Sequence, residues 1–218
     1  MDIPELIFVV GPNAAGKSSF IRTRLDSLKD FEVIMTDVYK GRTKSVFKQA
    51  LAQRKNIILE TVFNDESFKD LVDEAKSSGY YTSLLVLFLD TPQQSLDRVA
   101  FRSIEQNGLT ISGSNIKINF NESFKNIASY YFYFDQSDFV YTGITGKNAL
   151  IMSFSKMKLI LYNENQLQYP QKFADYGFIH KRISEEANSL IKSNRSYKAL
   201  EAASSIKEKR PLKKRIKF

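Results

Sequence analysis

The first hundred residues alternate between short apolar runs and longer stretches in which apolar residues recur every three or four positions. Short β-branched runs are typical of buried strands, and the longer spacing is typical of helices with one buried face. The pattern predicts strands at residues 5–10, 31–35, 56–59 and 82–89, and helices at residues 16–28, 43–53, 67–78 and 92–100. Strands separated by helices of this length form parallel βαβ units, so we expect an α/β fold with three layers and a mostly parallel sheet.

The pattern changes after Asn107 and Gly108, where residues 109–117 are polar and predict a mobile segment. Beyond them the spacing predicts a helix at residues 121–132, a small antiparallel meander with strands at 139–142, 150–154 and 158–162, and a C-terminal helix at 183–200. We find no repeat and no long linker. The chain is therefore expected to form one domain over residues 1–205, followed by a tail at 206–218.

Positive charge is concentrated at the C-terminal end. The formal net charge is +8, and residues 207–218 contain seven Lys or Arg and one Glu, so the rest of the chain is close to neutral. Such a tail favours contact with nucleic acid or an acidic partner, and the alternative is a solvated terminus. The absence of Cys excludes disulfides and thiolate metal sites. No apolar run approaches the roughly 20 residues of a membrane span, and the N-terminal residues lack a signal-peptide pattern, so we expect a cytoplasmic protein without a membrane partner.

One sequence motif predicts phosphate binding. Residues 11–18 read G-P-N-A-A-G-K-S and match the P-loop pattern G-x-x-x-x-G-K-[ST] between a predicted strand and a predicted helix. In such a loop backbone N–H groups surround the phosphates, Lys17 reaches the β- and γ-phosphates, and the Ser18 hydroxyl binds Mg²⁺. The predicted nucleotide-binding residues are Gly11, Pro12, Asn13, Ala14, Ala15, Gly16, Lys17, Ser18 and Ser19. We expect a P-loop NTPase or kinase fold that binds ATP, or alternatively GTP, with Mg²⁺; a chance glycine turn is the other interpretation.

The region after the fourth predicted strand favours a kinase over other P-loop proteins. The chain contains no N-K-x-D element for reading guanine, and the strand ends in Asp90-Thr91-Pro92 instead of the paired acids of an ABC-type ATPase. Arg98 and Arg102 follow on one face of the next predicted helix. A lid over residues 98–120 that closes these arginines on the transferring phosphate is one interpretation. A solvated arginine pair is the other.

Two acidic residues follow predicted strands at the edge where the P-loop lies. Asp37 comes after the second strand, where a carboxylate could accept the proton of an attacking hydroxyl or hold Mg²⁺ through water. Glu60 ends the third strand and could bind a substrate hydroxyl. For both residues the alternative is a capping or turn role.

Taken in order, these residues resemble the zeta-toxin family of P-loop kinases over roughly residues 4–162. The matching segments are E-L-I-F-V-V-G-P-N at 5–13, Asp37, L-E-T at 59–61, G-Y at 79–80, S-L-D-R-V-A-F-R at 95–102 and S-F-K-N-I at 123–127. The resemblance implies transfer of the ATP γ-phosphoryl group to a sugar hydroxyl of UDP-N-acetylglucosamine, and an antitoxin protein as partner. It further implies that Lys17 contacts the ATP phosphates, that Asp37 is the base, that Glu60 and Thr61 bind the sugar nucleotide, and that Arg98 and Arg102 lie in the lid.

The sequence departs from the family pattern in the lid. Asn107-Gly108-Leu109 stands where Gly-Gly-His is common, and Lys117-Ile118-Asn119 stands where the family has an arginine cluster. A lysine lacks the two-pronged geometry of an arginine, and Arg42 is a candidate compensating cation. Two other functions stay open: a polynucleotide or nucleoside kinase, favoured by the basic tail, and a nucleotide-binding regulatory module with weak or no turnover, favoured by the altered lid.

Overall fold

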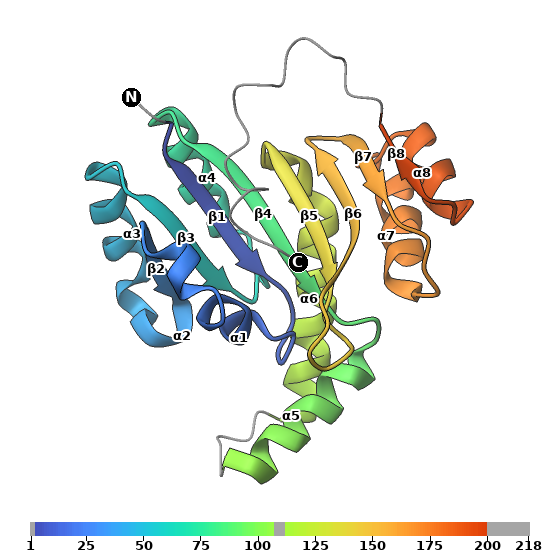
Figure 1. Cartoon of the computed structure of the whole chain (residues 1–218), viewed down its shortest axis with the longest axis horizontal. Coiled ribbons are helices and arrows are strands. Elements are labelled where there is room, and N and C mark those ends of the chain that lie inside the picture. Colours follow the sequence, from blue (N-terminus) through green and yellow to red (C-terminus); the bar gives the residue numbers. More distant parts are fainter. Residues whose placement is uncertain (1–2, 107–111, 200–218) are drawn as a thin grey trace.

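The computed structural model describes residues 3–106 and 112–199, and eight strands in these residues form one sheet (Figure 1). The strand order is β2-β3-β1-β4-β5-β6-β7-β8. The strands are β1 (Glu5–Val10), β2 (Phe31–Met35), β3 (Asn56–Thr61), β4 (Tyr81–Phe88), β5 (Gln136–Tyr141), β6 (Ala149–Ser155), β7 (Lys158–Tyr162) and β8 (Tyr197–Lys198). The first five strands are parallel to one another, and β6, β7 and β8 continue the sheet in antiparallel pairings that begin at β5.

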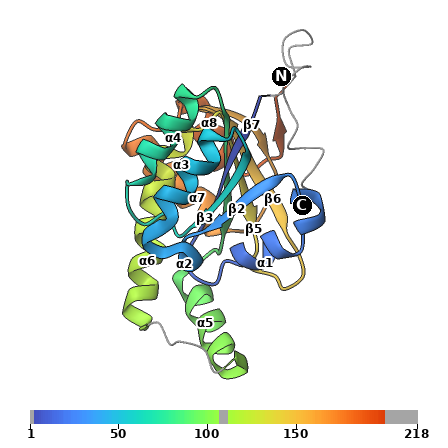
Figure 2. The same ribbon diagram turned by 90° about the vertical axis from the view of Figure 1, so that its left-hand side faces the viewer.

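Helices cover both faces of this sheet. The α-helices are α1 (Lys17–Arg22), α2 (Thr36–Tyr39), α3 (Thr43–Ala52), α4 (Phe68–Ser77), α5 (Pro92–Gln106), α6 (Gly113–Tyr130), α7 (Gln168–Ile179) and α8 (Glu185–Lys192). Three short 3₁₀ helices are η1 (Leu25–Leu28), η2 (Lys40–Arg42) and η3 (Tyr131–Tyr133). Figure 2 shows α3, α4 and α6 on one side of the sheet and α1 on the other. The predicted three-layer α/β architecture is confirmed.

The centre of the sheet is apolar because helices exclude water from it. Every residue of β1 is buried, and so is every residue of β4 except the first. A strand covered on both faces needs no polar alternation, which explains its continuous apolar run. Phenylalanines fill much of the core, and one cluster joins Phe8, Phe63, Phe68 and Phe134 under α4 and α6. The carboxyl ends of β1, β3 and β4 therefore form a rigid platform.

Three predictions for the second half of the chain need correction. The predicted mobile segment at 109–117 is wrong from Gly113 onward, because Ser112 caps α6 by accepting a hydrogen bond from the backbone N of Asn115 at 3.3 Å. The first strand of the predicted antiparallel meander is β5, which is parallel to β4 and antiparallel only to β6. The C-terminal helix predicted at 183–200 is present as α8 but is shorter than predicted: it ends at Lys192, and β8 follows and pairs with β7. Residues 107–111 and the basic tail lie outside the described residues.

Candidate active site

The predicted P-loop joins β1 to α1 at the carboxyl edge of the sheet. Gly11 has a φ of 145°, and a Cβ at this position would lie 1.9 Å from the backbone oxygen of Leu87. Only glycine fits so close to β4. Gly16, with a φ of 84°, ends the loop in the left-handed region that glycine adopts without strain. The fixed glycines of the motif therefore have separate reasons, close approach for the first and backbone conformation for the second.

Lys17 lies inside the loop that it follows. Its side chain is 7% exposed, and its Nζ donates to the backbone oxygens of Gly11 at 2.9 Å and Pro12 at 3.1 Å. Burial lowers the pKa of the Lys17 ammonium, and the carboxylates of Glu60 and Asp37 oppose this shift. Lys17 is thus held at the loop by main-chain oxygens, close to both carboxylates identified in the sequence.

Glu60 and Ser18 form an oxygen-rich pair beside the loop. Glu60 lies opposite Val9 in the pairing of β3 with β1, and its Oε2 accepts a hydrogen bond from Ser18 Oγ at 3.2 Å. Burial raises the pKa of Glu60, whereas Lys17 and the Ser18 hydrogen bond act in the opposite direction. A hydroxyl and a carboxylate are ligands that Mg²⁺ prefers, and Mg²⁺ commonly takes the rest of its shell from phosphates and water. The pair fits such an ion, although the described residues contain no cluster of three acidic or histidine side chains.

Asp37, whose charge acts on both Lys17 and Glu60, borders a cavity of about 470 Å³. The cavity lies between the segment that begins at α2 and the segment that follows β3, and two lysines, Lys40 and Lys44, line it together with Thr61. The predicted residues Asp37 and Thr61 are therefore brought together at one cavity. Arg42 lies on η2 but does not line the cavity.

The wall of the cavity includes a buried aromatic residue that the sequence did not single out. Phe63 has a φ of 64°, which is unusual for a bulky residue. Its backbone N donates to Thr61 Oγ1 at 3.3 Å, and its backbone oxygen accepts from Asn126 Nδ2 at 3.2 Å. The ring packs against Phe68 with centroids 3.7 Å apart. This packing and these two hydrogen bonds hold the conformation, so the cavity has a rigid wall.

The two arginines of the predicted lid, Arg98 and Arg102, have different surroundings. Arg98 reaches the outer side of the P-loop, where its Nη1 donates to the backbone oxygen of Ala14 at 3.3 Å and its Nη2 to that of Thr142 at 2.6 Å. Arg102, one turn further along α5, is exposed, and its positive charge adds to the lowering of the pKa of Lys17. Arg102 is therefore the arginine of the pair whose charge acts on the loop's lysine.

A chain of amides joins α6 to the P-loop and to the segment that follows β3. Asn119 Nδ2 on α6 donates to Asn13 Oδ1 in the P-loop at 2.9 Å, and Asn64 Nδ2 donates to Asn119 Oδ1 at 3.1 Å. Asn64 also lines the cavity. Lys117, the cation noted in the sequence, is exposed on the same helix. No local pattern could have identified Asn119, because its partners lie 55 and 106 residues away.

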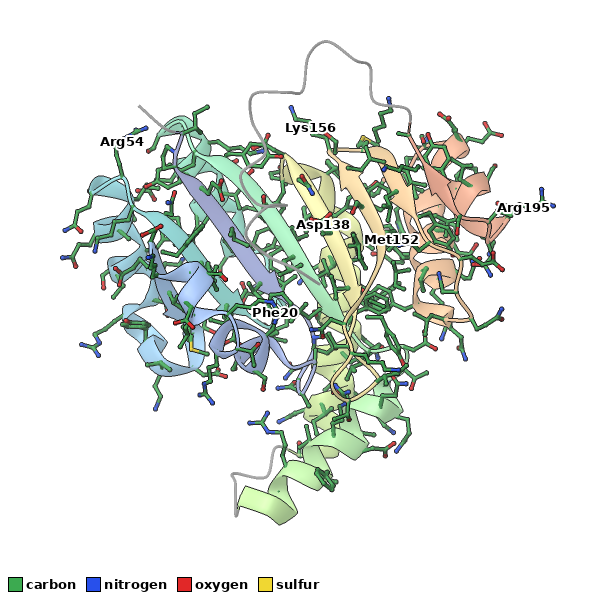
Figure 3. All side chains as sticks on the ribbon, viewed as in Figure 1. Phe20, Arg54, Asp138, Met152, Lys156 and Arg195 are labelled. Carbon is green, nitrogen blue, oxygen red and sulfur yellow. The ribbon has the colours of Figure 1, made fainter. Side chains whose placement is uncertain are left out.

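Another buried acid does not belong to this site. Figure 3 places Asp138 toward the middle of the sheet and Phe20 of α1 near its carboxyl edge. Asp138 accepts hydrogen bonds from Gln136 Nε2 at 2.8 Å and from Ser153 Oγ. It therefore serves the pairing of β5 with β6.

No helix in the described part of the chain has the length and apolar character needed to cross a bilayer.

No family model matches the sequence, and no curated protein sequence matches it. Solved structures do match. A chain from the PezAT chromosomal toxin–antitoxin system of Streptococcus pneumoniae has a TM-score of 0.58 and 12% identity, with 89% of this chain and 86% of that chain covered. The AvrRxo1-ORF1–AvrRxo1-ORF2 complex with sulphate ions gives a TM-score of 0.54 and 12% identity, with 90% and 78% covered.

The same complex with ATP gives a TM-score of 0.52 at 12% identity, with 89% of this chain and 77% of that chain covered. The similarities to the PezAT chain and to the complex with sulphate ions cover about nine-tenths of this chain. At this identity they establish the fold. The resemblance found in the sequence is confirmed at that level: the chain has the fold of zeta-toxin-like P-loop kinases.

Proposed function

We propose that this protein is a Mg²⁺- and ATP-dependent phosphotransferase. The observation that carries the proposal is the meeting of four groups at one edge of the sheet: the P-loop with Lys17, the Ser18–Glu60 pair, Asp37 and the cavity beside it. A phosphate-binding loop next to an acidic residue and an open cavity is what transfer between a bound nucleotide and a second substrate requires.

In this proposal each group has one task. Backbone N–H groups of the P-loop and Lys17 bind the β- and γ-phosphates, and Ser18 with Glu60 holds the Mg²⁺ shell. An acceptor hydroxyl in the cavity attacks the γ-phosphorus and gives its proton to Asp37, while the bond from that phosphorus to the bridging oxygen breaks and ADP leaves. Arg102 neutralises charge on the transferring group. The hydrogen bond to Ser18 favours a metal-shell role for Glu60 over the acceptor-binding role implied by the resemblance.

The acceptor that we propose is a sugar nucleotide similar to UDP-N-acetylglucosamine. Lys40 and Lys44 line the same cavity as Asp37, so a hydroxyl beside the carboxylate and an anionic group beside the lysines can be bound together. Lys40 and Lys44 are both exposed, so their side chains can adjust to an anionic group. We further propose an antitoxin as protein partner, since the similar structures include a toxin–antitoxin system.

A second candidate is a nucleotide-binding regulatory module with little turnover. It is favoured by the position of Arg98, whose guanidinium contacts main-chain oxygens on the outer side of the loop. Arginines that stabilise the transferring phosphoryl group contribute several orders of magnitude to the rate. A protein with only Arg102 for that task would bind ATP and transfer slowly.

The test is transfer of label from γ-labelled ATP to UDP-N-acetylglucosamine by the parent, by Asp37→Asn and by Asp65→Asn. Asp65 lines the same cavity but accepts a hydrogen bond from the backbone N of Ser67, a role that Asn can fulfil. Loss of the base is expected to lower the rate by about 10²- to 10⁴-fold, and the Asp65 variant should keep the parent rate. Equal rates for Asp37→Asn and the parent would contradict the role of Asp37. ATP binding without label transfer to any sugar nucleotide would favour the regulatory module.

A further inference from the structure

We propose that Ser95 and Arg98 are positioning residues that keep the P-loop in its anion-binding shape by holding Ala14 in a left-handed conformation. The inference rests on the proposed function only in requiring that the loop binds Mg²⁺–ATP. It assigns to Arg98 a task different from contact with phosphate.

The evidence begins with the outer side of the loop. The backbone oxygens of three successive residues, Asn13, Ala14 and Ala15, each accept a hydrogen bond from a side chain that is distant in the sequence. The donors are Ser95 Oγ at 2.6 Å, Arg98 Nη1 at 3.3 Å and Thr142 Oγ1 at 2.8 Å, respectively. We call these three donors the carbonyl clamp.

The clamp fixes the direction of the backbone N–H groups as well. In a trans peptide the C=O and N–H of one plane point in opposite directions. A carbonyl held on the outer side of the loop therefore turns the following N–H toward the inner side. This applies to the N–H groups of Ala14 and Gly16, which are in the part of the loop expected to surround phosphate, whereas the N–H of Ala15 donates to the backbone oxygen of Pro12 at 3.3 Å. Main-chain oxygens on the inner side would instead repel an anion.

Ala14 is the residue that resists this arrangement. Its φ is 57°, a region that glycine adopts freely and that a residue with a Cβ disfavours. Its two flanking peptide planes are the ones held by Ser95 and Arg98. Such a conformation persists only where the surroundings determine it, and here the clamp supplies those surroundings.

The clamp is itself anchored in the core. Ser95 is fully buried in the first turns of α5, and Thr142 is 7% exposed. Thr142 also donates from its backbone N to the backbone oxygen of Phe88 at 3.1 Å, and its own backbone oxygen accepts from Arg98 Nη2 at 2.6 Å. The ends of β4 and β5 and the start of α5 thus brace the loop as one unit.

Mg²⁺–ATP affinity, measured by calorimetry, tests this in the parent, Ser95→Ala, Arg98→Met and each of these combined with Ala14→Gly. Removal of either donor should weaken binding about tenfold, because relaxing a left-handed alanine is worth roughly that factor. Ala14→Gly should restore the affinity to within about threefold of the parent, because glycine keeps the left-handed conformation without help. Ser103→Ala is the matched control, since Ser103 lies on the same helix and its Oγ donates to Val99 of that helix.

The rescue separates the clamp from other roles of the same side chains. An Arg98 that contacted phosphate directly would leave a defect that Ala14→Gly cannot repair, and a general loss of folding would show as a lower Tm in all variants. Unchanged affinity in both single variants, or no rescue by glycine, would overturn this inference and leave the proposed function standing. A parent that binds no Mg²⁺–ATP would overturn both.

Discussion

Among single residues, Glu60 shows how the site can be tested without knowledge of the acceptor. Burial raises the pKa of Glu60, although the charge of Lys17 and the Ser18 hydrogen bond counteract it. Its protonation therefore begins at a higher pH than that of an ordinary glutamate. A protonated carboxyl cannot support Mg²⁺, so Mg²⁺–ATP affinity is expected to fall as the pH decreases through the pKa of Glu60.

The comparison is a titration of affinity from about pH 8 to pH 5 for the parent and Glu60→Gln. The terminal phosphate of ATP also titrates in this range, near pH 6 in related phosphates. Its protonation changes the affinity of the parent and of the variant alike. The parent should show an additional loss of affinity at acid pH that the variant lacks. Superimposable profiles would remove Glu60 from the metal shell.

What the sequence can predict at this scale depends on the distance between partners. Lys17 and Ser18 follow from a contiguous motif whose spacing is set by one loop. Ser95 and Thr142 could not be predicted, because they donate to backbone oxygens 82 and 127 residues away and leave no local pattern. Arg98 was identified by its spacing, but spacing gives only a helix face and not the group that the side chain meets.

Among the elements, α8 offers a stability test far from the candidate site. Ser184 caps this helix by accepting a hydrogen bond from the backbone N of Ala187 at 3.1 Å. Ser184→Ala should lower the free energy of unfolding by about 1 kcal/mol. For a chain of this size that corresponds to a decrease in Tm of about 2–4 °C. The control is Ser189→Ala on the exposed side of the same helix, which should leave the Tm close to the parent value.

Elements were predicted well where the apolar pattern is long and poorly where it is short. The strands β1 and β4 could be located to within a residue or two because helices cover both of their faces. The strand β8 has two residues and no periodicity, so the helical pattern before it was extended through it. The pairing of β5 with both β4 and β6 is decided by the tertiary fold, which local spacing does not contain.

For the whole molecule, the proposed function predicts stabilisation by nucleotide. Binding to the folded state alone, at a ligand concentration 100 times the Kd, adds about 2.7 kcal/mol to the free energy of unfolding. This should raise the Tm by about 5–10 °C in Mg²⁺–ATP. Lys17→Ala should lose most of that increase, because its ammonium lies inside the loop. A similar increase in the variant, or none in the parent, would contradict nucleotide binding at the P-loop.

The amide chain Asn64–Asn119–Asn13 also has a consequence for the molecule as a whole. It connects the wall of the cavity beside Asp37, the long helix α6 and the P-loop through two hydrogen bonds between uncharged groups. Salt screens charged contacts much more strongly than neutral ones. This connection should therefore persist at high ionic strength, whereas salt would weaken the contacts of an arginine cluster at the same place.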